Sequence, residues 1–387
     1  MASDRASFFT FGMFILDEIE WLDSSKSPVY NLIGGAGTYA VLGARLASSP
    51  CQRHAKNISW ILDEGSDFPT EVKSTIESWK TDCCFRLDKT RLTTRAWNGY
   101  GDNEFRSFKY LTPKKRLEVV DLDEQQVLSR SFHMVCSPER CMDICSKLNE
   151  RRRKLDEKVV RASEQPVIVW EPIPDLCSPA ELARLQQAAQ NCAVVSPNAE
   201  ELRRFFDPDA MTSKNDAALV KQLMGWSTST HSTASVVCVV REGANGSTGY
   251  MYDHVQDQIR SIHVPAYHSK DMQSSIIDPT GGGNTYLGAL AMALTGVLSD
   301  QPAHILIKRH FASTSIPEMA ISMIYATIAA SFVLEQHGVP SLEQRKVFTE
   351  IFEHWNGDAF IDRLKIYVDR ESKHIVKPTA VASSGSH

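Results

Sequence analysis

The sequence has no surplus of basic residues. Its 42 Lys and Arg residues stand against 47 Asp and Glu residues, which gives a net charge of −5 over 387 residues. We therefore expect no nucleic-acid partner, because proteins that bind nucleic acids carry a basic patch or stripe. The basic run at residues 151–154 is followed at once by Asp156 and Glu157, so we interpret it as a solvated helix face.

The sequence also lacks an uninterrupted apolar run that would suit a membrane span. The longest candidate, residues 316–334, contains Glu318 and has small residues at helical spacing, which favours a packed core helix. The first residues lack the charged start, apolar stretch and cleavage site of a signal peptide. We expect an intracellular, cytoplasmic protein without a membrane partner.

Paired cysteine spacing is absent as well. The nine cysteines are odd in number and scattered. Cys141 and Cys145 are spaced to share a helix face, but no His or Cys pair completes a zinc site. We expect reduced, structural thiols, as in other intracellular proteins.

What the sequence does contain is an alternation of strand and helix patterns. It predicts an α/β fold with a doubly wound, mostly parallel sheet flanked by helices. We expect one domain over residues 1–378, without repeats or a long linker, followed by a disordered tail at 379–387. The predicted strands are 8–16 (ending at Asp17), 29–33, 58–62, 132–136, 167–170, 193–195 and 236–240; the predicted helices include 38–47, 139–157, 179–191, 199–206 and 287–294.

Residues 91–110 interrupt this alternation. Aromatic residues alternate along the segment on both sides of the turn residues Gly101, Asp102 and Asn103. Alternating apolar residues around a Gly/Asp/Asn turn predict a β-hairpin.

The sharpest chemical signal is the segment from Asp278 to Tyr286. Gly281, Gly282 and Gly283 precede an apolar helix, so backbone N–H groups are exposed without side chains in the way. Together with the helix dipole they predict an anion site suited to a phosphate. A plain loop is the weaker interpretation, because three consecutive glycines cost backbone entropy.

This segment resembles the C-terminal signature of the PfkB, or ribokinase-like, family of sugar and nucleoside kinases. Further motifs resemble those of the family in the same order, over roughly residues 8 to 340. They are Gly12 with Asp17, the run Gly34-Gly35-Ala36-Gly37, the pair Asn198 and Glu201 in an Asn-x-x-Glu motif, the loop from Gly243 to Gly246, and the helix at 325–333.

The resemblance implies ATP-dependent phosphoryl transfer to a hydroxyl of a small sugar-, polyol- or nucleoside-like substrate, with ATP and Mg²⁺ as cofactors. It also implies a β-lid at about residues 88–112, and a monomer or a homodimer formed through that lid. The lid aromatics either contact the substrate or have a structural role. By position, the implied residues are Asn284 with Gly281, Gly282 and Gly283 for catalysis; Asp17, Gly34, Gly35, Tyr39, Trp97 and Arg106 for the substrate; Asn198, Arg241, Gly243, Gly246, Thr280, Thr327 and Ala330 for the nucleotide; and Glu201 for the metal.

Three positions depart from the family pattern. Tyr39 stands where sugar kinases usually have Asn, which argues against a simple pentose or hexose, and Arg241 stands where Thr is usual. Asn284 replaces the Asp that accepts the proton of the attacking hydroxyl, and an amide cannot act as a carboxylate base. The combination resembles the fungal maintenance-of-killer branch of the family.

Three functions stay open at this point. The chain is a slow kinase, with the base missing or supplied by His268, Asp102 or Asp278; or it is a pseudokinase that binds ligands or partners without turnover. The third is an NAD-dependent enzyme, since Gly35-Ala36-Gly37 followed by Asp63 at a strand end fits a dinucleotide fingerprint.

Overall fold

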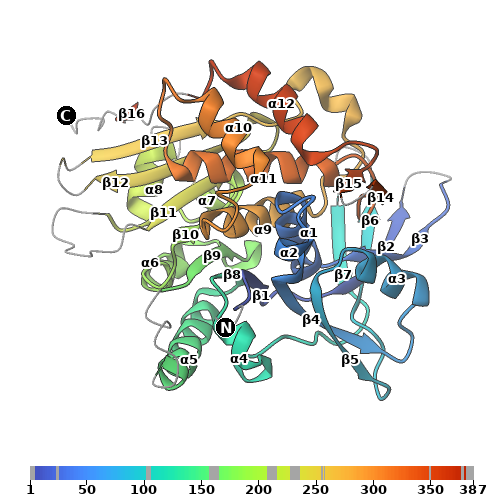
Figure 1. Cartoon of the computed structure of the whole chain (residues 1–387). Coiled ribbons are helices and arrows are strands. Elements are labelled where there is room, and N and C mark those ends of the chain that lie inside the picture. The colour runs from blue at the N-terminus through green and yellow to red at the C-terminus, as the bar shows by residue number, and fades with distance from the viewer. Residues whose placement is uncertain are drawn as a thin grey trace.

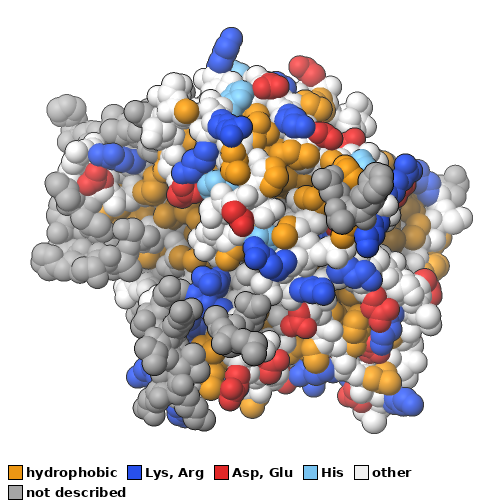
Figure 2. Space-filling model, viewed as in Figure 1, with side chains coloured by type: hydrophobic (Ala, Val, Ile, Leu, Met, Phe, Trp, Pro, Cys, Tyr) orange, Lys and Arg blue, Asp and Glu red, His pale blue; other side chains and the backbone are white. Residues whose placement is uncertain are grey.

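The computed structural model describes residues 5–22, 26–101, 106–156, 165–206, 216–226, 236–253, 256, 258–347, 350–375 and 379–380. In these residues a large sheet carries helices on both faces, and two smaller sheets lie at its edge (Figure 1). On the face shown in Figure 2, acidic and basic side chains are interspersed, in keeping with the near balance of charge.

The large sheet confirms the predicted parallel core. Among the described residues it holds ten strands in the order β16-β13-β12-β11-β10-β9-β8-β1-β4-β5. The parallel strands are β1 (Phe8–Thr10), β4 (Ile58–Gly65), β5 (Asp82–Asp88), β8 (Ser131–Cys136), β9 (Val167–Pro172), β10 (Val194–Val195) and β11 (Val237–Arg241); the antiparallel ones are β12 (Ser247–Asp253), β13 (Gln258–Val264) and β16 (Thr379–Ala380).

Two apolar clusters, one on each face of this sheet, make the fold doubly wound. In the described part of the chain, no helix is both long and apolar enough to cross a membrane. One cluster is covered by α1 (Ala36–Ala47), α3 (Thr70–Ser78), α9 (Gly282–Leu294), α10 (Pro302–His310), α11 (Glu318–Val333) and α12 (Phe360–Glu371); the other by α5 (Pro138–Asp156), α6 (Leu182–Ala189), α7 (Ala199–Arg204) and α8 (Asp216–Leu223), while α2 (Gln52–Lys56) and α4 (Glu124–Val127) are short connectors.

Helices α1 and α9 cross with their backbones in contact. A Cβ on Gly43 would collide with the carbonyl oxygen of Thr285, and one on Gly288 with that of Ala40. Both positions therefore require glycine, and this close crossing fixes the N-terminus of α9 relative to the start of α1.

The second sheet is a lid built from two separate parts of the chain. Its order is β3-β2-β6-β7, where β2 (Ile15–Trp21) pairs antiparallel with β3 (Val29–Gly34) and parallel with β6 (Arg95–Tyr100). Strands β6 and β7 (Arg106–Tyr110) pair antiparallel, as the hairpin pattern predicts. The predicted turn at Asp102 and Asn103 lies outside the described residues.

The prediction of one strand over residues 8–16 is wrong. The chain leaves the large sheet after β1 and continues as β2 in the lid, so Asp17 lies inside a lid strand rather than at the end of the first core strand. The bend falls at Gly12, where a Cβ would collide with the backbone of Gly37. An apolar run alone does not reveal that its two halves belong to different sheets.

The interpretation of residues 151–154 as a solvated face is also wrong for two of the four. Arg151 donates to the carbonyl oxygens of Val119 and Leu122, and the buried Arg152 donates to those of Val127 and Ser129. These arginines anchor the segment before β8 through its backbone carbonyl groups.

All nine cysteines are free, as expected, although the structure groups several of them. The Sγ atoms of Cys141 and Cys192 lie 3.6 Å apart in the core between α5 and the sheet. The end of the chain differs from the predicted tail in one respect: Thr379 and Ala380 pair with β13, while 381–387 lie outside the described residues.

A third, two-stranded sheet joins β14 (Leu342–Val347) to β15 (Glu350–Trp355). It is tied to α1 by the fully buried pair of Arg45 and Glu353, whose Nη2 and Oε1 atoms are 2.5 Å apart. The same Arg45 donates from Nε to the carbonyl oxygen of Trp79 at 2.7 Å.

Candidate functional site

The predicted glycine segment forms a tight entry into α9. Gly281 is the N-cap and has a left-handed backbone, with φ of 83°, and the helix starts at Gly282. The first N–H groups of a helix have no acceptor within it and lie at the positive end of its dipole. The structure therefore places exposed helix N–H groups beside Arg241 at the carboxyl end of β11, at the edge where open α/β sheets bind ligands.

Tyr39 supports this turn from below. Its ring is 4% exposed, and a Cβ on Gly281 would collide with it. The structure thus places Tyr39, predicted as a substrate residue, beneath the glycine turn. Leu334, just after α11, contacts the next residue, since a Cβ on Gly282 would lie 2.7 Å from its Cδ2.

A buried charged cluster lies beside the same turn. Arg241, at the end of β11, pairs through Nη2 with Glu171 and donates to the carbonyl oxygen of Ser196 at 3.0 Å. Its Nη2 also lies 3.5 Å from Oε2 of Glu201. A Cβ on Gly283 would collide with Nη1 of the same guanidinium, so Arg241 joins two carboxylates to the first turn of α9.

The Asn-x-x-Glu motif is a capping box at the start of α7. Asn198 accepts from the Glu201 N–H through Oδ1, and Glu201 accepts from the Asn198 N–H through Oε2, both at 2.8 Å. Burial raises the pKa of Glu201 to about 7, which Arg241 opposes and Glu171 reinforces. Burial of the His133 ring in β8 and, to a lesser extent, the nearby charge of Arg241 lower the pKa of His133 to about 3.

The donor set at this cluster does not fit a metal ion held by the protein. Mg²⁺ prefers several oxygen ligands in octahedral geometry. Glu171 and Glu201 are the carboxylates here, and both already pair with the fixed cation of Arg241. Within the described residues no group of three or more His, Cys, Asp or Glu side chains could hold a metal.

Asn284 lies in the first turn of α9, and its Oδ1 is buried without a hydrogen-bond partner. The structure offers little in place of a base. Asp278 is 2% exposed and accepts hydrogen bonds from Thr280 N and Tyr100 Oη, at 2.9 and 3.1 Å. Burial raises its pKa, but bonds from Thr280, His337 and Tyr100 outweigh burial and leave the pKa below its ordinary value.

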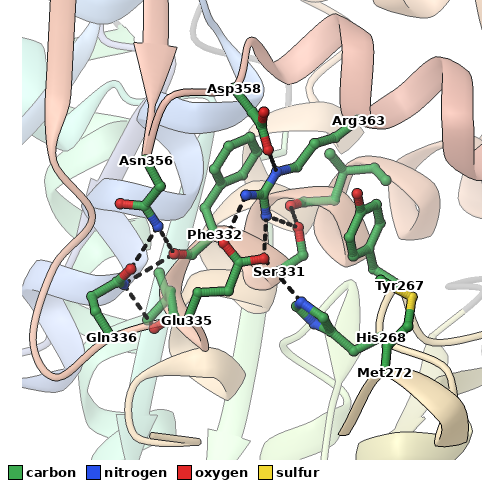
Figure 3. A network of polar contacts seen from close by, with 12 residues as sticks. Tyr267, His268, Met272, Ser331, Phe332, Glu335, Gln336, Asn356, Asp358 and Arg363 are labelled. Atoms are coloured by element: carbon green, nitrogen blue, oxygen red, sulfur yellow. Dashed lines mark hydrogen bonds and ion pairs between the residues drawn. The ribbon is translucent and has the colours of Figure 1, made fainter. Parts of the chain in front are cut away.

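His268, the second candidate base, belongs to a different network near the end of α11. Figure 3 shows it pointing toward Glu335, to which it hydrogen-bonds at 3.0 Å. Glu335 also pairs with Arg363 at 2.7 Å, and that guanidinium lies 3.9 Å from the centre of the Phe332 ring (Figure 3). Asp102, the third candidate, lies outside the described residues.

Thr327 and Ala330 lie on α11, which packs against α9. Their spacing of three, followed by Leu334 four residues on, places them along one side of the helix with the residue that contacts Gly282. Of the predicted loop glycines, Gly246 (φ 95°) has no room for a Cβ, whereas a Cβ on Gly243 (φ 57°) would meet no atom.

The lid contacts the glycine segment directly. The Tyr100 hydroxyl lies 2.8 Å from Oγ1 of Thr280 and donates to Asp278. His337 Nδ1 lies 3.1 Å from Oδ2 of Asp278, and its ring contacts the Trp21 ring of the lid in a T-shaped arrangement with centroids 5.5 Å apart. The lid is therefore closed over the start of α9.

Asp17 and Asn98 lie on one face of the lid. Asn98 donates to Oδ1 of Asp17 at 3.3 Å, and a Cβ on Gly34 would collide with Oδ2 of Asp17, so Gly34 leaves room for this carboxylate. Gly35 (φ 93°) caps α1 and has no room for a Cβ beside the Met13 carbonyl.

Trp97 lies on the opposite face, because successive strand residues point to opposite sides. It donates from Nε1 to Glu20 at 2.8 Å. The structure therefore does not bring Trp97 together with Asp17. Arg106 starts β7 opposite Tyr100, and nothing further is described of its side chain.

Sequence reasoning missed Glu171 and Asn98. Glu171 ends the apolar strand β9 with a charge, and such a residue at the carboxyl edge of a parallel sheet is a signal that could have identified it. The dinucleotide-binding alternative is wrong. Its fingerprint needs a strand, helix and strand of one sheet, whereas β3 before α1 belongs to the lid and β4 to the large sheet.

Solved structures with a similar fold include ribokinases and a nucleoside kinase. Ribokinase of Giardia lamblia matches with a TM-score of 0.59 and 15% identity, over 96% of this chain and 99% of that one. Nucleoside kinase of Methanocaldococcus jannaschii gives 0.55 and 15%, over 94% and 99%. A putative ribokinase II of E. coli, solved with ATP and Mg²⁺, gives 0.57 and 13%, over 94% and 99%. The fold is ribokinase-like.

Two fungal proteins are similar along nearly the whole sequence. Protein MAK32 of Saccharomyces cerevisiae is 36% identical over 378 residues, which cover 95% of this chain and 93% of that protein. An uncharacterised protein of Schizosaccharomyces pombe is 32% identical over 381 residues, 96% and 95% of the two chains. No family model matches. The chain belongs to the MAK32 family, in agreement with the resemblance to the maintenance-of-killer branch.

Proposed function

We propose that this protein binds the phosphates of ATP or ADP at the N-terminus of α9 and transfers a phosphoryl group slowly to a hydroxyl of a small molecule. The observation that carries the proposal is the combined anion site. The first turn of α9 has glycines at Gly281, Gly282 and Gly283, and the guanidinium of Arg241 contacts the last of them. Helix N-termini and arginines are both suited to phosphate oxygens.

The acceptor site in this proposal is the lid face that carries Asp17. A carboxylate and a neighbouring amide, here Asp17 and Asn98 at 3.3 Å, supply acceptors and donors that match vicinal hydroxyls of a sugar, polyol or nucleoside. The contacts of Tyr100 with Asp278 and Thr280 hold the lid over the glycine turn. A closed lid excludes water from the transfer, which would otherwise compete as an acceptor.

The low rate follows from Asn284. A positioned general base contributes about 10²–10⁴-fold to a rate, and an amide cannot serve as one. Most of the catalysis of phosphoryl transfer comes from positioning and charge stabilisation, for which this site retains the glycine turn and Arg241. Asp278 is a poor replacement for the base, since the hydrogen bonds that it accepts lower its pKa and with it the affinity of the carboxylate for a proton.

A thermal melt with nucleotide tests the binding step. A ligand at about 100 times its Kd stabilises the folded protein by about 2.7 kcal/mol. We expect ATP and ADP to raise the melting temperature, and NAD to leave it unchanged. Gly283→Ala should abolish the shift in melting temperature, because the added Cβ collides with Arg241. Gly296→Ala, just beyond the C-terminus of α9, should keep the shift. A melt that moves with NAD and not with ATP or ADP contradicts the proposal.

A second function is favoured by the same residue that lowers the rate. With no carboxylate at Asn284, the protein could bind nucleotide and ligand and act as a regulator without turnover. A panel of sugars, polyols and nucleosides incubated with labelled ATP distinguishes the two functions. Transfer to any member above the rate of heat-inactivated protein supports the kinase; nucleotide binding without transfer to any of them supports the regulator.

A further inference from the structure

Arg241 is a cation fixed inside the site. Its side chain is 13% exposed, and Nη2 is held by Glu171, by the Ser196 carbonyl at 3.0 Å and by Glu201 at 3.5 Å. Two of these partners are themselves fixed: Glu171 ends a core strand, and Glu201 is locked in the capping box with Asn198. The guanidinium is therefore part of the site before any ligand arrives.

The other edge of the guanidinium faces the anion site. Its Nη1 occupies the space that a side chain on Gly283 would take. The buried polar atoms that lack a hydrogen-bond partner in the described residues include Nε of Arg241, Oε2 of its partner Glu171, and Oδ1 of Asn284, the residue after Gly283. Unpaired buried polar atoms cost free energy, so a cluster of them beside a helix N-terminus indicates a place where a polar ligand completes the bonding.

Both carboxylates of the cluster are already paired with a cation, which favours an anion over a second cation as ligand. With Glu201 protonated, which its burial favours, Glu171 and Arg241 cancel and the positive end of α9 remains. With Glu201 ionised the cluster carries one negative charge, yet both carboxylates stay paired with the guanidinium. A divalent ion here would have to displace Arg241 or share its carboxylates, at a cost in desolvated charge.

We propose that Arg241 is the built-in cation of the phosphate site, so that the protein binds nucleotide phosphates in metal-free form and does not depend on Mg²⁺ for binding. This inference rests on the proposed function. A guanidinium suits the role because it stays charged, and Nη1 lies against the first turn of α9 while Nη2 holds the carboxylates. It also gives a physical meaning to Arg241 at a position where the family usually has Thr.

Calorimetric titration with ADP tests the inference, in buffer with excess Mg²⁺ and in buffer with EDTA. For the wild-type protein we expect the two Kd values to agree within ~3-fold. Arg241→Met, which keeps an unbranched apolar stem and removes the charge, should weaken ADP binding in EDTA by roughly 10- to 100-fold, the range of a hydrogen bond to a charged group. Added Mg²⁺ should restore part of that loss in the variant only.

Two further variants separate the charge of Arg241 from its structural role. Arg241→Met leaves Glu171 buried and unpaired, so the double variant Arg241→Met/Glu171→Gln removes both charges and protects the fold. It should show the same loss in EDTA. Arg260→Met is the matched control, because Arg260 pairs with Asp253 on the antiparallel strands, 2.8 Å apart, and should bind ADP as wild type does.

The outcomes separate this inference from the function on which it rests. Wild-type binding only with Mg²⁺ overturns the inference and leaves the proposed nucleotide binding intact. Equal binding of wild type and both Arg241 variants in EDTA also overturns it. No ADP binding in either buffer overturns the proposed function and the inference together.

Discussion

At the scale of single residues, the proposed function is tested most directly at Asn284. Asn284→Asp would place a carboxylate at the first turn of α9, where an acceptor hydroxyl would be deprotonated. We expect phosphoryl transfer or ATP hydrolysis to rise by up to ~10²-fold. ATP binding should weaken modestly, because the new charge repels the phosphates. Single-turnover assays with labelled ATP measure both effects.

Asn191→Asp is the control for this substitution, since it adds the same charge at an exposed residue after α6. It should leave transfer and binding unchanged. Brisk transfer by the wild type that slows in Asn284→Asp would show that the base lies elsewhere.

Glu201 makes the stability of the folded protein depend on pH. Its pKa of about 7 in the folded protein lies above the ordinary value of a Glu carboxyl, mainly because the carboxyl is buried. The charge of Glu171 raises the pKa further, while Arg241 and Arg204 lower it without cancelling the effect of burial. The folded state therefore holds a proton that the unfolded chain releases. This contribution to stability is present at low pH and is lost as the pH rises through about 7.

Urea unfolding of wild type and Glu201→Gln between about pH 5 and about pH 8 measures this contribution. Relative to the Gln variant, the wild type should lose a few kcal/mol over this range, since one pKa unit corresponds to about 1.4 kcal/mol. Parallel pH curves for the two proteins would assign the pH dependence to other groups.

Residue types and their spacing were enough to place Gly281, Gly282 and Gly283 at the N-terminus of a helix, because a helix start is a local feature. They were not enough to pair Arg241 with Glu171. These residues are 70 positions apart, and their contact depends on the order β9-β10-β11 in the sheet. Strand order arises from packing over the whole domain. The partner of a charged residue at a strand end therefore cannot be predicted from the sequence around that residue alone.

At the scale of elements, the crossing of α1 and α9 sets the position of the glycine turn. Gly288→Ala would drive a Cβ into the carbonyl of Ala40 and push the helices apart. We expect a loss of about 2–3 kcal/mol in the free energy of unfolding, as for other overpacked cores, together with weaker nucleotide binding. Chemical denaturation and the nucleotide melt measure the two losses.

Gly296→Ala, where a Cβ meets no atom, is the matched control for this crossing. Its left-handed backbone makes alanine unfavourable by about 1 kcal/mol, without effect on the site. Equal losses in the two variants would mean that the close approach of α1 and α9 has no special role.

The lid is held closed by the hydroxyl of Tyr100. Tyr100→Phe removes its hydrogen bonds to Asp278 and Thr280 and keeps the ring. We expect faster release of bound nucleotide, by roughly 10-fold for about 1.4 kcal/mol of lost contact, with the fold intact. Stopped-flow displacement measures the release rate. Tyr110→Phe in β7, whose ring meets Phe108 instead, should release nucleotide as wild type does.

Element types were easier to predict than element membership. The pattern from Phe8 to Leu16 is correctly extended, yet it spans β1 of the large sheet and β2 of the lid. The reason is tertiary: Gly12 bends the chain only because the backbone of Gly37 packs against it. The role of Asp17 changes with this bend, from a residue at the edge of the core sheet to a residue of the lid.

At the scale of the whole molecule, the pair of Arg45 and Glu353 connects the first helix to the C-terminal sheet. Both side chains are fully buried, and Glu353 also accepts from Ser49 and Gln344 at 2.7 and 2.9 Å. Arg45→Met leaves this carboxylate without its charge partner, so we expect a loss of about 3–5 kcal/mol. Thermal and urea unfolding measure it.

Arg45→Met/Glu353→Leu removes both charges and should recover much of that stability, since a buried pair can often be replaced by apolar residues. A double variant as unstable as the single one would show that shape, rather than charge, matters at this junction.

A homodimer through the lid stays a prediction from sequence, and sedimentation of the wild type tests it.

The parallel pairing of β2 with β6 has a consequence for how the chain acquires its cover. Leu16 pairs with Arg95, so closing this pair requires the intervening α1, β4, α3 and β5 to be in place, and such long-range pairings form slowly. The lid cannot be excised, transplanted or added as a cassette, because each of its halves is continuous with a strand or helix of the core. If the core segment between β2 and β6 is not folded, these two lid strands cannot pair. The complete lid therefore forms only after the core beneath it has folded.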